Sequence, residues 1–425
     1  MLINIIKAVF RQLGAGGMQF LIIIIVARNT GVDTTGQFNL ILSLPLVFAT
    51  FLSLGLNSSN VYFISGNLID AKEVLTASIV FYVGLSIPTT LVYFVIITVF
   101  PQFNVIEPLL QFIILLSAFI LLFHNNNLSI LQAKENFSTM NVLLLLQPAL
   151  LLFFVFILLA YNSFNIELLL YTYALTLMIV CLISTRQVIN RVGIGGVKHK
   201  QVKLILGKIV PYGIKSYVTN LCAVLNYKAD MFILAALSGI SAVGIYTVAV
   251  QISERLTVFS QAISLVVLPR LSSTAEGKAL ILSKIFRLSL IFQLIISVIF
   301  VAMLQALIVF LFGIEFESAV LTGWVLIPGM LFISLNRILA NYFASEGLPM
   351  VNFKCSLIAL IFNILLNVML IPDFSYLGAA IATSFSYLIN LMLTVFFLIR
   401  HDSRINLIDL FMSKKQDFKL KNNEF

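Results

Sequence analysis

The sequence predicts an all-α polytopic membrane protein with about twelve transmembrane helices, arranged as two six-helix bundles. Three observations support this fold class. The 425 residues are 60% hydrophobic and only 10% charged, with a mean hydropathy of +1.08. Apolar runs of about 20 residues, each long enough to cross a bilayer, recur from end to end. Basic residues gather in alternate loops between these runs, which is typical of loops that stay in the cytoplasm.

The expected spans follow one another with short connections. Each is a run of roughly 20 mostly apolar residues, the length that crosses a hydrocarbon core of about 30 Å. A β-barrel would instead show alternating segments of about 10 residues. In order along the chain, the spans cover 4–27, 37–60, 74–100, 108–131, 141–161, 165–185, 209–237, 242–268, 285–312, 320–343, 353–371 and 377–399.

The charge pattern predicts that both termini lie in the cytoplasm. Basic residues occupy the N-terminal segment, every second loop and the C-terminal tail, whereas acidic residues such as Asp33, Glu167 and Glu315 occupy the other loops. Arg28 breaks the pattern. A missed or extra helix would place all later basic loops on the wrong side of the membrane. The separation of basic from acidic loops therefore supports the count of about twelve spans. The net charge of +9 therefore indicates topology rather than a partner nucleic acid.

The two halves of the chain resemble each other, which predicts an internal repeat. "VARNTGVDTTGQF" (26–38) matches "LAALSGISAVGIY" (234–246), and "LQAKENFSTMN" (131–141) matches "YFASEGLPMVN" (342–352). Six helices per half give both repeats the same orientation, with a pseudo-two-fold axis along the membrane normal and a central cavity. The predicted parts are an N-terminal bundle, a basic cytoplasmic linker, a C-terminal bundle and a basic cytoplasmic tail: 1–190, 191–208, 209–400 and 401–425.

No catalytic, cofactor or metal signature stands out, so the sequence does not predict an enzyme. His124, His199 and His401 are far apart, and the three cysteines are scattered through apolar helices without metal-ligand spacing. The chain has no G-x-x-x-x-G-K-[ST] phosphate-binding loop. The loops opposite the cytoplasm are too short to form a catalytic domain.

Buried cations are the strongest candidates for a substrate site. Arg255 and Arg337 fall inside predicted spans, where a guanidinium needs water or an anion nearby. Lys215 lies deeper than the basic linker, and it either snorkels to the headgroups or lines the cavity. Arg11 precedes the small-residue run 14–17, which favours close helix packing. We expect these four cations to line the cavity.

Two carboxylates are candidates for coupling transport to an ion. Glu254 lies beside Arg255 near the middle of span 242–268, and adjacent residues of an α-helix point about 100° apart, so the two cannot form an ideal ion pair. An ion pair with another helix and a wet coupling site both remain open. For Asp230 the alternative is interhelical packing. Three polar residues are expected to face the cavity, with interhelical hydrogen bonding as the alternative for the asparagines: His124, Asn125 and Asn336.

Segments around these residues resemble a known family. They are "ARNTGVDTTGQFNL" (27–40), "LGL" (54–56), "KADMFILAALSGISAVGIYTVAVQ" (228–251), "LPR" (268–270) and "LGAAIATSFSY" (377–387). In order and spacing they are similar to the Wzx-type O-antigen and polysaccharide flippases of the multidrug/oligosaccharidyl-lipid/polysaccharide (MOP) exporter superfamily. The resemblance covers nearly the whole chain.

The resemblance implies a V-shaped pair of six-helix lobes that work by alternating access. It implies transfer of undecaprenyl-pyrophosphate-linked oligosaccharide from the inner to the outer leaflet of the bacterial inner membrane, with the lipid bilayer and glycan polymerase or assembly proteins as partners. A cationic lumen suits the pyrophosphate.

Three alternatives stay open. A MATE-type drug/cation antiporter would prefer acidic and aromatic cavity walls. A major-facilitator carrier would have a basic motif between its second and third spans, where "SGNLIDAKEVL" stands instead. A membrane enzyme of glycan assembly would need longer outer loops.

Overall fold

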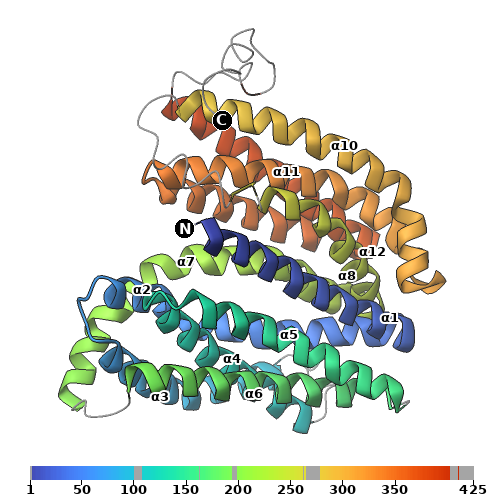
Figure 1. Ribbon diagram of the computed structural model, residues 1–425. Coiled ribbons are helices and arrows are strands. Elements are labelled where there is room, and N and C mark those ends of the chain that lie inside the picture. The colour runs from blue at the N-terminus through green and yellow to red at the C-terminus, as the bar shows by residue number, and fades with distance from the viewer. Residues whose placement is uncertain are drawn as a thin grey trace. The chain divides into compact units, whose positions relative to one another are not determined.

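The residues that the structure describes are almost entirely helical (Figure 1). The computed structural model describes residues 2–99, 108–161, 163–193, 199–261, 263–264, 278–402 and 410. Eight of its helices are long and apolar enough to cross a membrane. The predicted all-α, multi-pass membrane fold is therefore confirmed.

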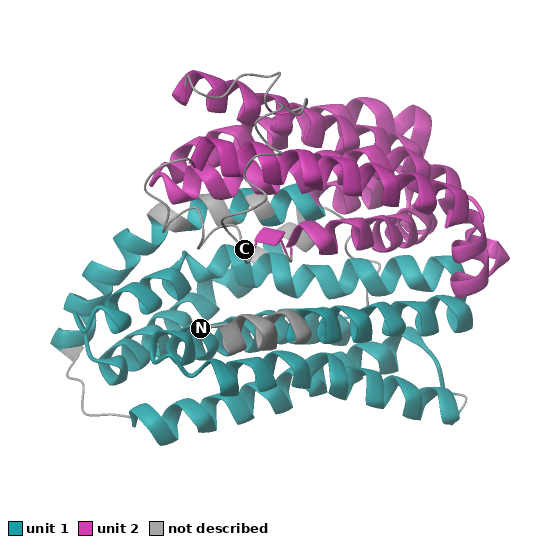
Figure 2. Ribbon diagram, turned by 45° about the horizontal axis from the view of Figure 1, so that its top comes forward, with its two compact units in different colours: residues 1–228 teal, residues 229–425 magenta. Residues whose placement is uncertain are grey.

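The chain packs as two compact units, residues Met1–Lys228 and Ala229–Phe425 (Figure 2). Unit 1 contains α1 (Leu2–Ser53), α2 (Leu56–Ser65), α3 (Ala71–Val99), α4 (Pro108–Ala133), α5 (Phe137–Ala160), α6 (Ile166–Val192) and most of α7 (His199–Ser238). Unit 2 contains the end of α7, α8 (Ile240–Ser253), η2 (Glu254–Leu256), α10 (Lys278–Phe312), η3 (Ile314–Phe316), α11 (Ala319–Ser345) and α12 (Pro349–His401). The domain limits predicted from the sequence stay predictions.

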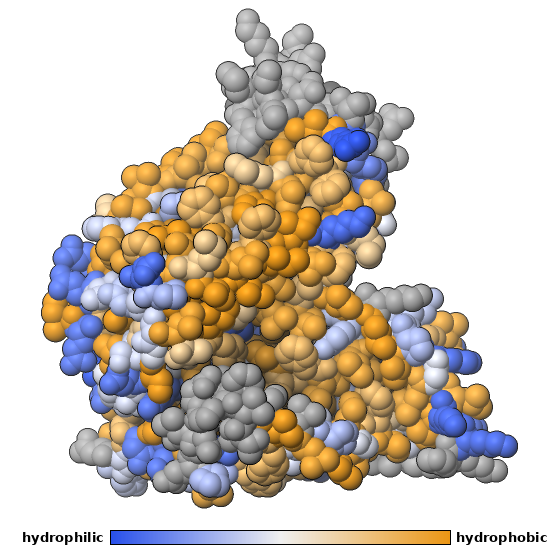
Figure 3. Space-filling view, turned by 180° about the vertical axis from the view of Figure 1, so that it is seen from behind, coloured by the Kyte–Doolittle hydropathy of each residue, from blue (hydrophilic) through white to orange (hydrophobic). Residues whose placement is uncertain are grey.

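Apolar side chains cover the outside of the helices as well as their packed faces. Ile87, Phe310 and Met369 are 70%, 74% and 69% exposed. Hydrophilic residues gather at the helix ends, and the lengths between are mostly hydrophobic (Figure 3). Large exposed apolar surfaces are rare on soluble monomers, so this belt is the surface that contacts lipid.

Two long helices each extend over two predicted spans: α12 contains both of its spans, and α1 contains the first span and most of the second. α1 bends at Gly31, with φ 76° and ψ −173°, and α12 bends at Ser375, with φ 49° and ψ −128°. The second predicted span, 37–60, is wrong in one detail, because the structure divides it. Leu54 and Gly55 have positive φ angles of 42° and 74° between the end of α1 and the start of α2.

The internal repeat is visible in the backbone. Gly239, the counterpart of Gly31, has φ 88° and ψ 178°, which is nearly the conformation of Gly31. A residue with a Cβ rarely adopts a positive φ of this kind, so both positions require glycine. α4 packs against α1, α2, α3, α5 and α6 in unit 1, and its counterpart α11 packs against α8, α10 and α12 in unit 2. Each unit is therefore built around the same repeated helix.

Candidate functional site

Glu254 and Arg255 lie in a 3-10 turn that interrupts the eighth predicted span. η2 follows α8, and α-helix resumes at Thr257. The sequence predicts a continuous α-helix here, and this prediction is wrong. Within the turn the carbonyl of Leu256 accepts a hydrogen bond from Nε2 of Gln293 at 3.2 Å. A 3-10 helix has about three residues per turn, so Glu254 and Arg255 point even further apart than in an α-helix.

The two arginines of unit 2 that the sequence predicts as site residues lie on elements that touch. Arg255 is half-buried. Its Nε donates to the backbone carbonyl of Gln251, and one of its terminal nitrogens donates to Oε1 of the Gln251 side chain, both at 3.0 Å. Arg337 is half-buried on α11, which packs against η2. Among the residues that the structure describes, none forms a hydrogen bond or ion pair with Arg337. Its guanidinium carries five N–H donors, and none of them is bonded within the described part of the chain.

The other two predicted cations belong to unit 1. Arg11 is half-buried in α1. Lys215 lies in α7, and its side chain is outside the described residues. The grouping of these two cations with Arg255 and Arg337 around one cavity stays a prediction.

His124 belongs to a hydrogen-bond network between α4 and α6. Its Nδ1 lies 3.1 Å from Oγ of Ser184. Asn127, one turn along, donates from Nδ2 to Ser184 Oγ at 3.1 Å and to Thr185 Oγ1 at 2.8 Å. The side chain of His124 is 5% exposed. These contacts lie inside unit 1 and stabilise its packing.

The asparagines differ in their surroundings. Asn126 accepts from Nδ2 of Asn60 at 2.8 Å, which joins α4 to α2. Asn125 is half-buried on α4. Asn336 is buried on α11, and its Oδ1 has no hydrogen-bond partner among the residues that are described. Interhelical packing therefore accounts for Asn126, and the role of Asn125 and Asn336 in a cavity stays a prediction.

Asp230 joins three helices of unit 2. It is 4% exposed, and its Oδ1 accepts from the backbone N–H of Met231 at 2.7 Å. Its Oδ2 accepts from the hydroxyl groups of Tyr246 and Thr383, the latter at 3.2 Å. Sequence reasoning found Asp230 but missed Tyr246 and Thr383 as its partners, because no spacing rule connects α7 with α8 and α12.

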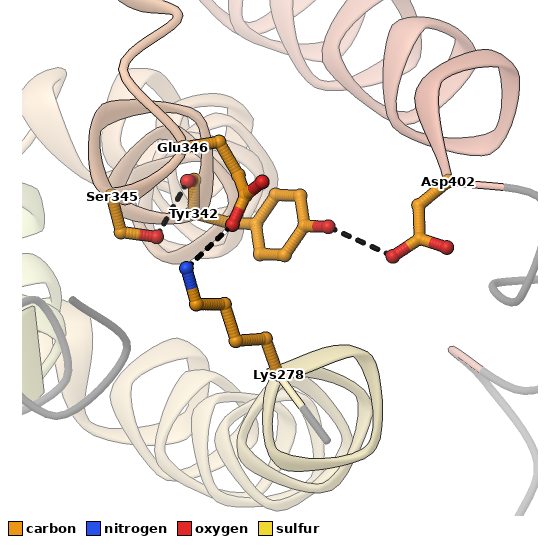
Figure 4. Close-up of polar contacts among 5 residues, drawn as sticks. All are labelled: Lys278, Tyr342, Ser345, Glu346 and Asp402. Atoms are coloured by element: carbon orange, nitrogen blue, oxygen red, sulfur yellow. Dashed lines mark hydrogen bonds and ion pairs between the residues drawn. The ribbon is translucent and has the colours of Figure 1, made fainter. Parts of the chain in front are cut away.

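A second polar cluster lies where α10 begins and where α11 and α12 end (Figure 4). Lys278 Nζ is 2.7 Å from Glu346 Oε1, and the hydroxyl of Tyr342 donates to Oδ2 of Asp402 at 2.9 Å. The ion pair is partly exposed, and such pairs contribute about 1 kcal/mol or less. The cluster stabilises the packing of these helix ends, and it includes none of the predicted site residues.

Sequence reasoning also missed a row of polar residues on α10. Ser289, Gln293 and Ser297 are all buried, at 2%, 1% and 8% exposed. Their spacing of four residues places them on one helix face, and this spacing is the signal that could have found them. The described part of the chain has no group of three or more His, Cys, Asp or Glu that could hold a metal ion.

Known proteins share both sequence and fold with this chain. The model of the family described as "Polysaccharide biosynthesis protein" matches residues 2–275. An uncharacterized membrane protein of Methanocaldococcus jannaschii is 31% identical over 175 residues, which cover 40% of this chain and 34% of that relative. The match thus spans about a third of the curated relative's length.

Solved structures with a similar fold are transporters. The lipid II flippase MurJ, in an inward closed conformation, gives a TM-score of 0.77 at 15% identity, covering 94% of this chain and 87% of that one. An inward-facing MATE family multidrug transporter of the MOP superfamily gives a TM-score of 0.71 at 15% identity. The match covers 92% of this chain and 95% of that one. At this identity the likeness concerns the fold.

Proposed function

The chain belongs to the polysaccharide biosynthesis protein family, and from this premise we propose that it is a flippase for lipid-linked oligosaccharide. The proposed cargo is an undecaprenyl-pyrophosphate-linked repeat unit of O-antigen or another polysaccharide. It would move from the inner to the outer leaflet by alternating access. The proposed location is the bacterial inner membrane, with both termini in the cytoplasm. The family match carries the proposal, and the MOP fold supports it.

The cations of unit 2 support an anionic cargo. A pyrophosphate needs charge-assisted donors when it leaves water, and guanidinium groups match its oxygens in a bidentate manner. Arg337 has such donors available, and Arg255 lies on the adjoining element η2. Arg11 and Lys215 are the proposed contribution of unit 1. A cation-exporting pump would be better served by acidic groups at these positions.

We further propose that export is coupled to an ion gradient through a buried carboxylate. Glu254 is half-buried in η2, and Asp230 is buried at the contact of α7, α8 and α12. Carboxylates inside a membrane segment are costly and commonly belong to ion pathways. Either a proton or a sodium ion could neutralise the charge of such a carboxylate.

A MATE-type antiporter is the second candidate, favoured by the fold likeness to MATE transporters. One experiment separates the two functions. The gene is expressed in a bacterial strain that lacks its own O-antigen flippase, and surface glycan is measured together with resistance to cationic drugs. Restored surface glycan supports the flippase. Drug resistance without glycan would support the antiporter.

Replacing Arg255 and Arg337 together by alanine should abolish most glycan export. Each charged hydrogen bond to the cargo contributes about 1.5–3 kcal/mol, so each loss corresponds to roughly 10- to 100-fold in binding. Lysine at both positions should restore export only in part, because a point charge cannot make bidentate contacts. Surface glycan per amount of membrane protein is the measurement.

Arg400 provides the control for these arginines. It also belongs to unit 2, but it is exposed at the end of α12. The Arg400→Ala variant should export at the normal level. Normal export from the double variant Arg255→Ala, Arg337→Ala would exclude both residues from the cargo site.

A further inference from the structure

The start of α7 is an amphipathic segment of unit 1. One face of this segment carries Val202, Ile205 and Ile209, which are 4%, 7% and 0% exposed. Their spacing of three and four residues places them on one side of the helix. They pack into a core cluster together with residues of α1, α2, α3 and α4. The segment is therefore held on unit 1 by its apolar side.

The opposite face of the segment is basic. Lys200, Lys203 and Lys208 are all exposed. Among the residues that the structure describes, none forms an ion pair or a side-chain hydrogen bond with these lysines. Two acidic residues, Asp70 and Glu73, stand at the start of α3, and neither of them pairs with a lysine of α7. The three positive charges are thus not neutralised within the described part of the chain.

An apolar side chain stands in the middle of the basic face. Leu204 is 67% exposed. At about 100° per residue, it lies between Lys200 and Lys208 around the helix. A Cβ at Gly207 would meet nothing within 4 Å, so the face is open there. Helices at a membrane surface have this pattern, because the apolar side chain enters the acyl region while the long basic side chains reach the headgroups.

The exposed side of α7 becomes apolar further along the helix. Ile214 and Val218 are 44% and 38% exposed. At about 100° per residue, they lie on the side that carries the lysines a few turns earlier. Both belong to the predicted span 209–237. The exposed side thus changes from basic to apolar after Lys208, as expected of a helix that passes from the headgroup layer into the hydrocarbon core.

Two stacked tyrosines mark the level of this change. Tyr212 lies one turn beyond Lys208, and its ring stacks on that of Tyr62 of α2, with the centroids 4.4 Å apart and 16° between the planes. Tyr62 is 48% exposed. Tyrosine is enriched at membrane–water interfaces, where the ring contacts the acyl chains and the hydroxyl contacts the headgroups. The tyrosines and the lysines therefore independently place the same stretch of α7 at the headgroup level.

We propose that Lys200, Lys203, Leu204 and Lys208 form a docking surface for the headgroups of anionic phospholipids. Clustered lysines beside a membrane span are attracted to an anionic leaflet, and the sequence predicts that this segment faces the cytoplasmic one. The chain passes from unit 1 to unit 2 within α7, after Lys228. A bound lipid therefore holds the start of the connecting helix at the membrane surface. This partner is a lipid of the surrounding membrane, separate from the cargo proposed above.

Phospholipid binding to the purified full-length protein in neutral detergent tests the surface. Phosphatidylglycerol and phosphatidylcholine with the same acyl chains are added at equal concentrations, and native mass spectrometry measures the lipid retained. We expect the wild-type protein to prefer phosphatidylglycerol. Each lysine near an anionic surface contributes roughly five-fold, so the variant Lys200→Gln, Lys203→Gln, Lys208→Gln should bind phosphatidylglycerol about ten-fold more weakly or less. Its binding of phosphatidylcholine should be unchanged.

A second triple variant removes the same charge from other places. Lys134→Gln, Lys354→Gln and Arg400→Gln alter exposed residues that are far apart in the sequence and lie on the predicted cytoplasmic side. This control should keep the wild-type preference. An equal loss in both triple variants would show that net charge alone governs the binding, and it would overturn the proposal. A wild-type protein without any preference for phosphatidylglycerol would overturn it as well.

An environment-sensitive fluorophore on Leu204→Cys, with the three native cysteines replaced by alanine, reports the depth of the segment. In phosphatidylglycerol vesicles its emission should shift to the blue relative to the same label in the triple lysine variant. Emission typical of bulk water, unchanged between the two, would remove the segment from the membrane surface and overturn the proposal.

Inorganic pyrophosphate distinguishes a lipid headgroup from a soluble phosphate. At constant ionic strength it should not displace phosphatidylglycerol, because it lacks the acyl chains that hold the lipid beside Leu204. Displacement would assign the lysines to a soluble anion and overturn the lipid surface. No cargo is present in these measurements. Failure of glycan complementation would therefore count against the flippase and leave the lipid surface standing, and the reverse also holds.

Discussion

A methyl group added at Gly213 should destabilise unit 1 by about 3 kcal/mol and reduce the folded protein recovered from the membrane. Gly213 lies where α7 crosses the break between α1 and α2. A Cβ at this position would be 2.7 Å from the carbonyl oxygen of Leu54 and 2.9 Å from the carbonyl carbon of Gly55. Both are backbone atoms, which cannot rotate away. A Cβ at Gly55 would in turn be 2.1 Å from the carbonyl oxygen of Gly213.

Two hydrogen bonds depend on this close approach. Ser59 donates from Oγ to the carbonyl of Ile209 at 2.7 Å, and Tyr217 donates from its hydroxyl to the carbonyl of Phe51 at 3.1 Å. Moving α7 outward to admit a methyl group would lengthen both bonds. The loss of stability therefore includes weakened hydrogen bonds as well as the steric overlap at Gly213.

Gly207 supplies the control within the same helix. A Cβ at Gly207 meets nothing within 4 Å. Alanine is better than glycine in a helix by about 1 kcal/mol, so Gly207→Ala should leave stability unchanged or raise it. Melting temperature and the monodisperse fraction in detergent measure both variants. Equal stability of Gly213→Ala and Gly207→Ala would show that the two backbones are not confined as described.

Much of this fold can be predicted from the sequence because the bilayer restricts which structures can cross it. Every backbone polar group inside a bilayer must be satisfied within its own helix, so an apolar run of sufficient length predicts a helix. The matched motifs around Gly31 and Gly239 predict the repeat, and both glycines adopt the same backbone conformation. The fold class, the family resemblance and the multi-pass character follow from these patterns, and they are confirmed.

Contacts between distant segments were beyond the reach of the sequence. The run 14–17 is the most conspicuous group of small residues. A Cβ at Gly14 would be 3.3 Å from Cδ2 of Leu145 on α5, a side-chain atom, and a Cβ at Gly17 would meet nothing within 4 Å. The tight contact uses isolated glycines, Gly55 and Gly213, whose partnership depends on the path of the whole chain. The 3-10 turn at Glu254 was missed for the same reason, because the amide that bonds to its backbone comes from Gln293 on α10.

Replacing Asp230 by alanine should have the second large effect, about 3 kcal/mol or more of lost stability in unit 2. The carboxylate accepts hydrogen bonds from Tyr246, from Thr383 and from the backbone N–H of Met231. Alanine would leave all three donors without this buried acceptor. Asparagine keeps one acceptor oxygen, so Asp230→Asn should lose only about 1–2 kcal/mol.

Folded yield and melting temperature give the stability of these variants, and surface glycan per folded molecule gives their activity. Tyr246→Phe removes one donor and should lie between the wild type and Asp230→Ala in stability. Asp373, which is exposed on α12, is the control, and Asp373→Ala should behave as wild type. A stable Asp230→Ala variant would contradict the structural role. If Asp230→Asn folds normally but exports no glycan, the carboxylate couples export to an ion, since only its charge has been removed while its place between the three helices is kept.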